Sequence, residues 1–329
     1  MRTPTVVFPA PDRVAIEELE EHDPGPGQVL VRTTISVISI GTELTVLTRA
    51  GWAKHVPFPF LPGYSMAGEV LAVGPGVTDF TVGDRVCGGG HHTQYEVREA
   101  RDLNHIPATV ADEAAAFRTL GQITLNGVRQ GQLVFGEAVV IIGMGLVGQM
   151  ATQWARFAGA LPVIAVDLSP RRLDIASEIG PLVAIQGDCD GALATIRTAT
   201  RGRLADVVIE ATGVADVIPG ATRLARNQGR IVLLGSPRGS TTIDLHDSVH
   251  ARGLHLIGAH NNTHPPVATL GNPWTRERDG ELFLDLLAAG RADVQALITH
   301  RYPWQQAPAA YALLQEHPGD ALGVVLDWR

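Results

Sequence analysis

The chain has 329 residues, of which 45% are hydrophobic and 18% are charged, and its formal net charge is −8 at pH 7. This is the composition of a globular protein of about two domains, not of a disordered or membrane-embedded chain. The acidic excess argues against a nucleic-acid partner, because phosphate binding requires clustered positive charge. No apolar run approaches the roughly 20 residues that cross a bilayer, and residues 1–7 do not resemble an export signal. We therefore expect a cytoplasmic protein that does not bind a membrane.

Short β-branched runs separated by glycine and proline fill the first third of the sequence. The runs lie at residues 29–31, 68–73 and 83–86, and Pro24-Gly25-Pro26-Gly27 and Gly74-Pro75-Gly76 are turn signals between them. This pattern indicates a small all-β barrel or sandwich. Thr109 and Asp112 then resemble a capping box, which predicts an Ala-rich helix from Asp112 to about Leu120.

From about residue 138 the sequence alternates apolar strands with helical stretches. Strands are expected at 138–142, 163–166, 182–185, 206–209, 230–234 and 254–258, with one helix ending near 157 and another at 171–179. Continuous apolar strands that alternate with helices indicate a parallel sheet covered on both faces. After Gly258 the pattern is mixed, and it ends in a strand at 323–327.

A three-glycine motif, Gly143-Met144-Gly145-Leu146-Val147-Gly148, follows the first of these strands and opens a helix. Gly143 permits a tight turn, Gly145 lets the backbone approach a pyrophosphate, and Gly148 lets helix and strand pack closely. The N-terminus of the helix then presents N–H groups and a positive dipole end to the phosphates. We predict a dinucleotide site here, with a ligand-free glycine turn as the alternative.

Other candidate cofactor residues follow the ends of later strands. Asp167 stands about twenty residues after the glycines, where an acid accepts hydrogen bonds from both ribose hydroxyls. A carboxylate at this position repels a 2′-phosphate, so NAD is favoured over NADP, although Arg171 and Arg172 could soften the preference. Ligands of open α/β sheets bind at the carboxyl ends of strands, so two further loops should flank the cofactor, with Thr212 in one and Gly235 and Ser236 in the other.

Several stretches resemble the medium-chain alcohol dehydrogenase family over nearly the whole chain. They are Pro24 to Val31, Gly63 to Val70, Val82 to Val86 and the glycine loop. The resemblance implies an α/β fold with a Rossmann doubly wound parallel sheet and a GroES-like β-barrel catalytic domain. It places the catalytic domain at residues 1–119, the dinucleotide-binding domain at 120–259 and a part that returns to the catalytic domain at 260–329. It also implies a homodimer formed near Leu254 to Gly258.

The sequence departs from zinc-dependent members of that family where they bind their metal. Ile40-Gly41-Thr42-Glu43 stands at the position of the first ligand, and Gly63-Tyr64-Ser65 stands at the position of the second. Tetrahedral zinc takes Cys, His or carboxylate, so none of Ile40, Tyr64 and Ser65 is a plausible ligand. We therefore predict a zinc-independent member.

Two further regions support this prediction. Phe117 to Leu120, at the third ligand position, lacks a zinc-binding side chain, and Cys87 to His92 replaces the four-cysteine lobe of many relatives. The side chains of adjacent His91 and His92 diverge, so a metal pair is not expected. His92 is predicted to line the active-site cleft, because it aligns with the family's aromatic or histidine position before Tyr95. A plain surface histidine is the alternative.

Without zinc, side chains must stabilise the developing charge and relay the proton that alcohol oxidation releases. The resemblance assigns Thr42 to the hydroxyl that begins the relay, while Thr45 stands where many relatives have a relay histidine. Tyr64 is expected to point into the cavity left by the metal and to act as proton donor or base. The alternative is that Tyr64 only fills this cavity. Glu43 is expected to support the fold around these residues.

Residues 259–265 resemble the polar stretch by which sorbitol-type dehydrogenases meet substrate hydroxyls. We therefore predict that His260 and Asn261 contact the substrate, together with Glu43 and Ser65. A polar subunit-contact loop is the alternative for residues 259–265. The sequence also assigns Gly143, Gly145, Leu146, Val147, Gly148, Asp167, Arg172, Thr212, Gly235 and Ser236 to the cofactor.

The leading hypothesis is reversible NAD-linked oxidation of a secondary alcohol or polyol-like small molecule. Residues 39–43 also resemble the bacteriochlorophyllide-forming dehydrogenases, so a bulky biosynthetic intermediate is a second kind of substrate. Reduction of a conjugated C=C bond, as in zinc-free quinone and enoyl reductases, is an alternative; those enzymes mostly use NADPH, against which Asp167 argues. A non-catalytic protein that holds the nucleotide is the alternative from another class.

Overall fold

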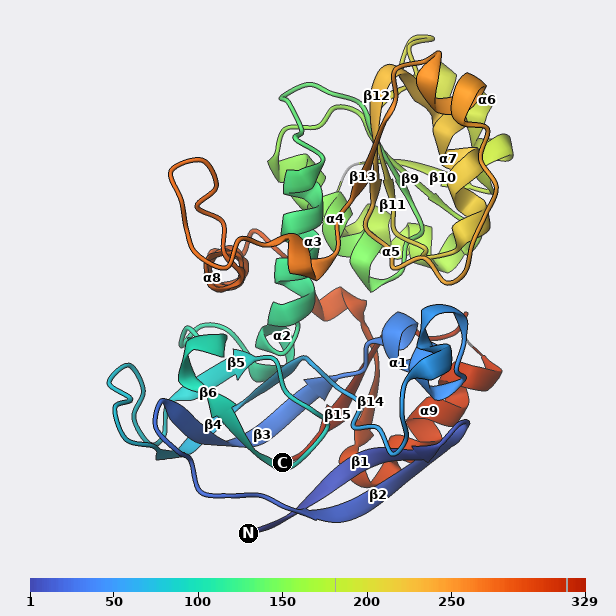
Figure 1. Cartoon of the computed structure of the whole chain (residues 1–329). Helices are drawn as coiled ribbons and strands as arrows, with labels where there is room; N and C mark the ends of the chain where they lie inside the picture. Colours follow the sequence, from blue (N-terminus) through green and yellow to red (C-terminus); the bar gives the residue numbers. More distant parts are fainter. Residues whose placement is uncertain (181, 318) are drawn as a thin grey trace. The chain divides into compact units, whose positions relative to one another are not determined.

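The computed structural model describes residues 1–180, 182–317 and 319–329. It divides into two compact units, whose elements are labelled in Figure 1. Unit 1 comprises Met1–Gln122 and Pro265–Arg329, and unit 2 comprises Ile123–His264. The divisions thus follow Gln122 and His264, whereas the sequence predicted them after residues 119 and 259. No helix among the described residues is long and apolar enough to cross a membrane.

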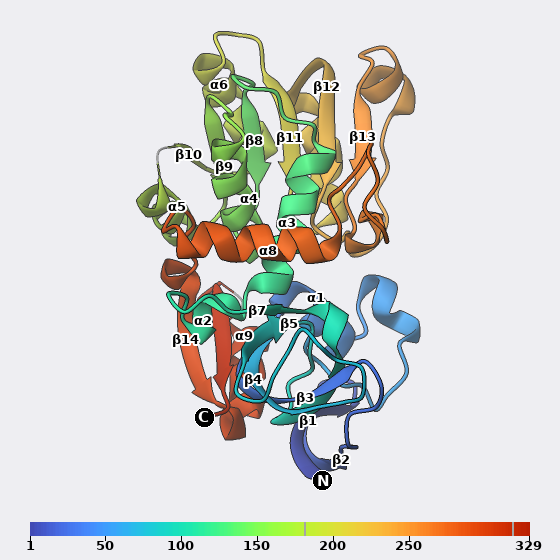
Figure 2. The same cartoon turned by 90° about the vertical axis from the view of Figure 1, so that its left-hand side faces the viewer.

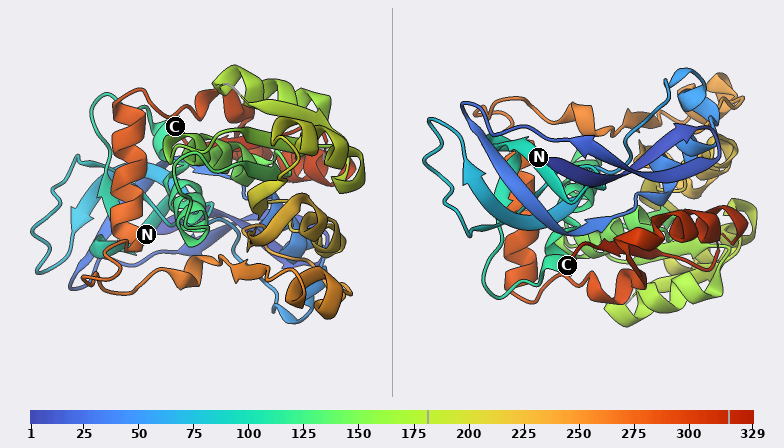
Figure 3. Two further views of the ribbon diagram at one scale, coloured as in Figure 1. Left: turned by 90° about the horizontal axis from the view of Figure 1, so that it is seen from above. Right: turned by 90° about the horizontal axis from the view of Figure 1, so that it is seen from below.

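Unit 1 is built mainly on antiparallel strands, whereas β14 and β15 pair in parallel. A seven-stranded sheet has the order β14-β15-β3-β4-β5-β7 with β6 also paired to β3, and β1 and β2 form a separate ribbon, seen in dark blue in Figure 3. The strands are β1 (Arg2–Ala10), β2 (Arg13–Glu20), β3 (Gln28–Val37), β4 (Met66–Val73), β5 (Arg85–Gly88), β6 (Tyr95–Glu99), β7 (Leu103–His105), β14 (Ile298–Pro303) and β15 (Gly323–Asp327). The helices are α1 (Ile40–Leu47), α2 (Asp112–Ala115), α3 (Arg118–Gln130), which continues into unit 2, α8 (Arg276–Ala288) and α9 (Ala307–Glu316). Short helical turns are η1 (Gly51–His55), η2 (Ala100–Asp102), η6 (Gln295–Leu297) and η7 (Trp304–Gln306).

Two apolar clusters hold unit 1 together. One lies among β3, β4 and β5 and includes Val29, Met66 and Val86, all fully buried. The other joins the chain's ends, because Phe8 of β1, Leu47 of α1 and Tyr311 of α9 belong to it. Helix α1 is therefore packed in the same cluster as the N-terminal ribbon and the C-terminal helix.

The prediction of one continuous, capped helix from Asp112 to Leu120 is wrong. α2 ends at Ala115, α3 begins only at Arg118, and the residue before α2 is Ala111, which offers no side-chain cap. The Asp112 carboxylate instead accepts hydrogen bonds from Arg85 Nε at 3.0 Å and from Thr34 Oγ1 at 2.8 Å. Because a bond to the arginine of a neighbouring strand is available, the local capping pattern is not used.

Unit 2 confirms the predicted parallel sheet. Its strand order is β10-β9-β8-β11-β12-β13, and the six strands stand side by side in Figure 2. The strands are β8 (Val139–Ile142), β9 (Val163–Asp167), β10 (Val183–Gln186), β11 (Ala205–Glu210), β12 (Ala225–Leu233) and β13 (His255–Gly258), all paired in parallel. The helices are α4 (Leu146–Phe157), α5 (Pro170–Ile179), α6 (Cys189–Ala199) and α7 (Ile218–Leu224), with turns η3 (Ala215–Val217), η4 (His246–His250) and η5 (Asn261–Thr263).

The burial of the central strands explains why this sheet could be predicted from the sequence. All four residues of β8 and residues 163–166 of β9 are buried. Successive side chains of a strand point to opposite faces, so complete burial means that both faces are covered. The sheet's carboxyl edge carries the loops described next.

Candidate active site and cofactor site

The glycine loop of unit 2 connects β8 to α4, and two of its three glycines are required by the protein itself. Gly143 has φ of 92°, and a Cβ there would lie 2.6 Å from Thr212 Cγ2. A Cβ on Gly148 would lie 1.8 Å from the Gly143 carbonyl oxygen. Any side chain at these positions would collide with its neighbours or strain the backbone.

Gly145 is different, because nothing in the described structure requires it to be glycine. Its φ is −71°, which any residue can adopt, and a Cβ there would meet nothing within 4 Å. It stands at the N-terminus of α4, where no side chain among the described residues caps the helix, and Leu146 and Val147 form the first turn. An open approach to uncapped N–H groups fits a pyrophosphate. The residues present therefore suit a bound dinucleotide.

Asp167 is the last residue of β9, as predicted. Its Oδ2 accepts a hydrogen bond from the Met144 N–H at 2.6 Å, and its Oδ1 accepts one from the Ser169 N–H at 2.7 Å. A carboxylate offers about four acceptor positions, so two remain for the hydroxyls of a ribose. The acid thus both ties the glycine loop to the following loop and stays able to bind a sugar. Nearby, the Arg172 carbonyl accepts from Gln149 Nε2 at 2.7 Å, which joins α5 to α4.

The other two predicted cofactor loops lie together at the carboxyl ends of β11 and β12. Buried Glu210 accepts hydrogen bonds from the Thr212 N–H at 2.6 Å and from the Gly213 N–H at 3.2 Å. Burial raises the pKa of the Glu210 carboxyl above its ordinary value, and these bonds partly offset that rise. A Cβ on Gly235 would lie 2.4 Å from the Gly213 backbone nitrogen, and a Cβ on Gly213 would lie 2.6 Å from the Ser236 carbonyl oxygen. The structure therefore brings Thr212, Gly235 and Ser236 to one edge.

The polar segment at the end of unit 2 is held against α3. Asn126 Nδ2 donates to Thr263 Oγ1 at 2.8 Å, and this hydroxyl donates to the His260 carbonyl at 2.8 Å. His260 is exposed and Asn261 is half-buried. The Asn261 Oδ1 is a buried acceptor that has no hydrogen-bond partner among the described residues. An unsatisfied buried acceptor calls for a partner that the protein does not supply, such as an ordered water or a bound group.

In unit 1 the hydroxyl-bearing residues Ser39, Thr42 and Tyr64 lie together, and the family resemblance assigns the position of Tyr64 to a metal ligand. The Tyr64 phenol is hydrogen-bonded to the Ser39 hydroxyl, and the Thr42 hydroxyl is near enough to lower the pKa of the phenol. Burial raises the pKa of Tyr64 above 10, the two hydroxyl groups lower it, and the nearby Glu43 carboxylate raises it. The sequence predicted that Tyr64 and Thr42 take part in catalysis, but it did not single out Ser39.

The predicted position of His92 at the cleft is corrected by the structure. The ring is fully buried, with Nδ1 2.8 Å from Ser36 Oγ and Nε2 3.1 Å from Glu43 Oε2. The Trp328 indole donates to Ser36 Oγ at 2.9 Å, so the Ser36 O–H is available to His92 Nδ1 and the ring donates to Glu43 from Nε2. Both ring nitrogens are engaged inside the protein, which leaves none to touch a substrate.

The side chains of Glu43 and Ser65 are also internal, not open to a substrate. Glu43 is 1% exposed; it accepts from the Ser39 N–H at 2.8 Å and from the Tyr311 hydroxyl. Ser65 is fully buried, and its hydroxyl donates to the Ala116 carbonyl at 2.6 Å. Glu43 therefore acts as the expected support, whereas Ser65 joins the strand β4 region to α2.

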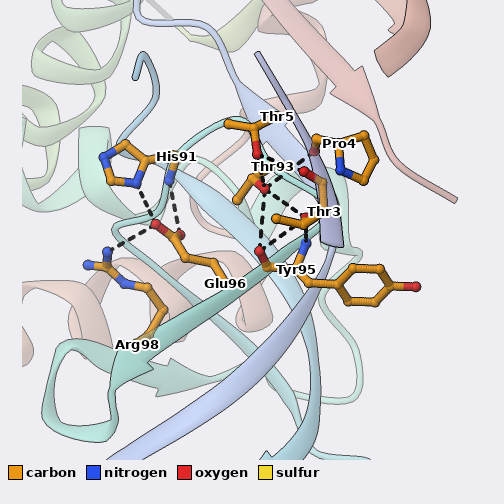
Figure 4. A network of polar contacts seen from close by, with 8 residues as sticks. All are labelled: Thr3, Pro4, Thr5, His91, Thr93, Tyr95, Glu96 and Arg98. Atoms are coloured by element: carbon orange, nitrogen blue, oxygen red, sulfur yellow. Dashed lines mark hydrogen bonds and ion pairs between the residues drawn. The ribbon is translucent and has the colours of Figure 1, made fainter. Parts of the chain in front are cut away.

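His91, the neighbour of His92, takes part in a separate polar cluster. Figure 4 shows its ring pointing to Glu96, which Arg98 also approaches at 3.5 Å. The same view shows Thr3, Thr5 and Thr93 bonded to one another across the β1 edge. The two adjacent histidines thus diverge, as predicted, and each has a carboxylate partner of its own.

The donor set of unit 1 does not fit zinc. In residues 1–180, 182–317 and 319–329, no group of three or more His, Cys, Asp and Glu side chains is placed to hold a metal ion. Burial raises the pKa of the Cys87 thiol to about 12, which disfavours the thiolate that zinc needs. At the third ligand position, Arg118 is buried and donates from Nε to Asn104 Oδ1 at 2.6 Å. No metal-dependent step is derived from these residues.

Comparison with known proteins agrees with this architecture. The alcohol dehydrogenase GroES-like domain matches residues 25–152, and the family described as zinc-binding dehydrogenase matches residues 147–270. L-threonine 3-dehydrogenase of Symbiobacterium thermophilum is 31% identical over 93% of this chain and 92% of its own length. D-guloside 3-dehydrogenase of Shigella flexneri is 26% identical over 96% of this chain and 97% of its own. The solved structure of an alcohol dehydrogenase from Thermus sp. ATN1 has 26% identity and a TM-score of 0.82, with 99% of both chains covered.

A GroES-like unit joined to a Rossmann unit with a glycine loop defines an oxidoreductase that uses a nicotinamide dinucleotide. The chain belongs to the medium-chain dehydrogenase/reductase superfamily, in its alcohol dehydrogenase-like branch.

The glycine loop yields a paired prediction. Gly145→Ala should fold normally, because its methyl group meets no protein atom, but it should weaken NAD binding at least about tenfold by occupying the approach to the phosphates. Gly148→Ala should instead lower the melting temperature by several degrees, because its methyl group collides with the Gly143 carbonyl. Fluorescence titration with NADH and thermal melts measure the two effects. Unchanged affinity in Gly145→Ala would contradict the assignment of this loop.

Proposed function

We propose that the chain catalyses zinc-independent, reversible, NAD-linked oxidation of a secondary alcohol with further hydroxyl groups. The observation that carries the proposal is the hydrogen bond between the Ser39 hydroxyl and the Tyr64 phenol, because the family resemblance assigns the position of Tyr64 to a metal ligand. Hydroxyl groups can hydrogen-bond the oxygen of an alcohol or ketone and exchange a proton with it. The chemistry that zinc supplies in relatives is assigned here to these side chains.

The direction of proton transfer follows from the pKa of Tyr64. A bound nicotinamide would accept or supply the hydride. Because burial raises the pKa of Tyr64 above 10, the phenol is neutral at pH 7 and can donate its proton to a carbonyl oxygen. Oxidation of the alcohol needs the opposite step, in which the phenolate takes the hydroxyl proton. The raised pKa therefore favours reduction at neutral pH and oxidation at alkaline pH.

The cofactor preference is assigned to Asp167, whose carboxylate ends β9 beside the glycine loop. A 2′-phosphate would bring negative charge next to this carboxylate, so NAD is the proposed cofactor. His260 and Asn261 are the proposed contacts of the substrate's additional hydroxyls, supported by the unsatisfied Asn261 Oδ1. A small hydroxylated molecule is the proposed substrate class.

The direct test is a substrate panel that contains secondary alcohols, polyols, ketones and enones, followed by nicotinamide absorbance. We expect turnover of hydroxylated secondary alcohols or their ketones in protein that contains no zinc by elemental analysis. Stoichiometric zinc whose removal abolishes activity would contradict the proposal. Reaction on enones alone would favour the C=C reductase reading, and nucleotide binding without any turnover would favour a non-catalytic protein.

Tyr64→Phe should lower kcat/KM about a hundredfold or more, because it removes the proton donor while keeping the ring. In the unmodified enzyme, kcat/KM for ketone reduction should stay flat to about pH 10 and fall above it, since the neutral phenol persists to that pH. Oxidation should rise about tenfold per pH unit over the same range, because it uses the scarce phenolate. A Tyr64→Phe enzyme within about threefold of the original would show that Tyr64 only fills space.

Asp167→Ser should raise KM for NAD about tenfold or more and lower KM for NADP, because it removes both a ribose acceptor and a repelling charge. Asp174→Ser is the matched control, since Asp174 is an exposed carboxylate on α5. A KM for NADP below that for NAD in the unmodified enzyme would overturn the assignment of the cofactor.

We also propose that the chain is a cytoplasmic homodimer formed through β13. This strand is at the edge of the six-stranded sheet and carries Leu256, which is 40% exposed. Leu256→Lys should therefore convert a species of twice 35.0 kDa into a monomer, measured by light scattering. Leu161→Lys, at another exposed leucine of unit 2, should leave the mass unchanged. A monomer before mutation would refute this assembly.

A further inference from the structure

Ser39 occupies the N-cap position of α1 but does not cap the helix with its side chain. A serine here ordinarily accepts a hydrogen bond from an N–H of the first turn, which is why serine is favoured at helix starts. The Ser39 hydroxyl is instead bonded to the Tyr64 phenol. The Glu43 carboxylate, one turn into the helix, accepts the Ser39 N–H at 2.8 Å. Ser39 is thus held by its backbone while its side chain serves another residue.

The geometry of α1 brings a second hydroxyl to the same phenol. Thr42 follows Ser39 by three residues, and positions three apart lie on one side of a helix. Its hydroxyl is near enough to lower the pKa of Tyr64. A phenol oxygen accepts hydrogen bonds through its lone pairs and donates only one. If the Ser39 hydroxyl donates to the phenol oxygen, the Tyr64 O–H is not used by Ser39 and is available to a ligand.

We propose that Ser39 is a positioning residue for the reaction: it holds the phenol oxygen of Tyr64 so that the Tyr64 proton points to the substrate oxygen. The inference rests on the proposed role of Tyr64 as proton donor. No bond forms or breaks at Ser39, because its hydroxyl keeps its proton and donates a hydrogen bond before and after the transfer.

The surroundings explain why Ser39 stays in place. Glu43 is bonded to Ser39, to His92 at 3.1 Å and to Tyr311, so three separate segments of unit 1 converge on one buried carboxylate. Of the ionisable groups near the phenol, the Glu43 carboxylate raises the pKa of Tyr64, whereas His92 and Tyr311 are bonded to Glu43. The hydrogen bond from Ser39 lowers the pKa of Tyr64. Its removal should therefore move the titration of Tyr64 to higher pH.

The chain has only four tyrosines, so ¹³C labelling at tyrosine Cζ gives four resonances, and Tyr64→Phe identifies the one of interest. In Ser39→Ala we expect this resonance to titrate at higher pH than in the unmodified protein. We expect kcat/KM to fall about tenfold, the effect of one hydrogen bond, while KM for NAD changes less than about twofold. Ser39→Thr, which keeps the hydroxyl, should restore both values.

Thr48→Ala is the matched control, because it removes a hydroxyl from the other end of α1, where Thr48 Oγ1 donates to the Leu44 carbonyl at 2.8 Å. It should leave the Tyr64 titration in place. An unshifted Tyr64 titration in folded Ser39→Ala would overturn the inference, whatever the activity. A shifted titration with no turnover of any panel substrate would support the bond between Ser39 and Tyr64 and refute the proposed function alone. Lost activity that Ser39→Thr does not restore would reduce Ser39 to a structural role and overturn the proposal.

Discussion

The arrangement of unit 1 depends on the hydrogen bonds that the buried Glu43 carboxylate accepts. An isolated carboxylate in an apolar interior is strongly unfavourable, so it must be surrounded by donors. Here the donors come from the start of α1, from the loop before β6 and from α9, through Ser39, His92 and Tyr311. Because these segments are distant in sequence, one carboxylate joins the beginning of α1 to the loop before β6 and to the C-terminal helix α9. The hydroxyl groups of Ser39 and Thr42 are consequently presented on a rigid element.

In the proposed function, hydroxyl groups take the place of a metal, and they stabilise charge differently. A zinc ion stabilises negative charge on a substrate oxygen directly, whereas Ser39, Thr42 and Tyr64 are neutral and stabilise it by donation. Burial and the Glu43 carboxylate both raise the pKa of Tyr64, which keeps the phenol protonated at neutral pH. At that pH the site therefore offers a proton donor to a carbonyl, because the phenolate base is scarce.

The sequence predicted unit 2 more fully than unit 1, and the physical reason is locality. The central strands β8 and β9 are continuous apolar runs that are buried on both faces, and Gly143 and Gly148 are required by a positive φ and by a carbonyl of the same loop. In unit 1 the decisive partners are distant: Asp112 bonds to Arg85 instead of capping its helix, and His92 is buried because Ser36 and Glu43 receive it. Nothing local distinguishes His92 from the half-exposed His91. Ser39 could have been noticed, since serine is a preferred N-cap residue at the start of a helix.

The packing of the fold does not explain why residue 145 is a glycine or why the Ser39 side chain does not cap its helix. Gly143 and Gly148 are explained by the atoms around them, but Gly145 has an ordinary backbone and open space where its side chain would be. Ser39 likewise holds a position at which its side chain would stabilise α1, yet its hydroxyl is directed to Tyr64. A fold selected for stability alone would accept alanine at the first position and a capping serine at the second. Under the proposed function, a phosphate group of the cofactor would account for Gly145, and a reacting substrate oxygen near Tyr64 would account for Ser39.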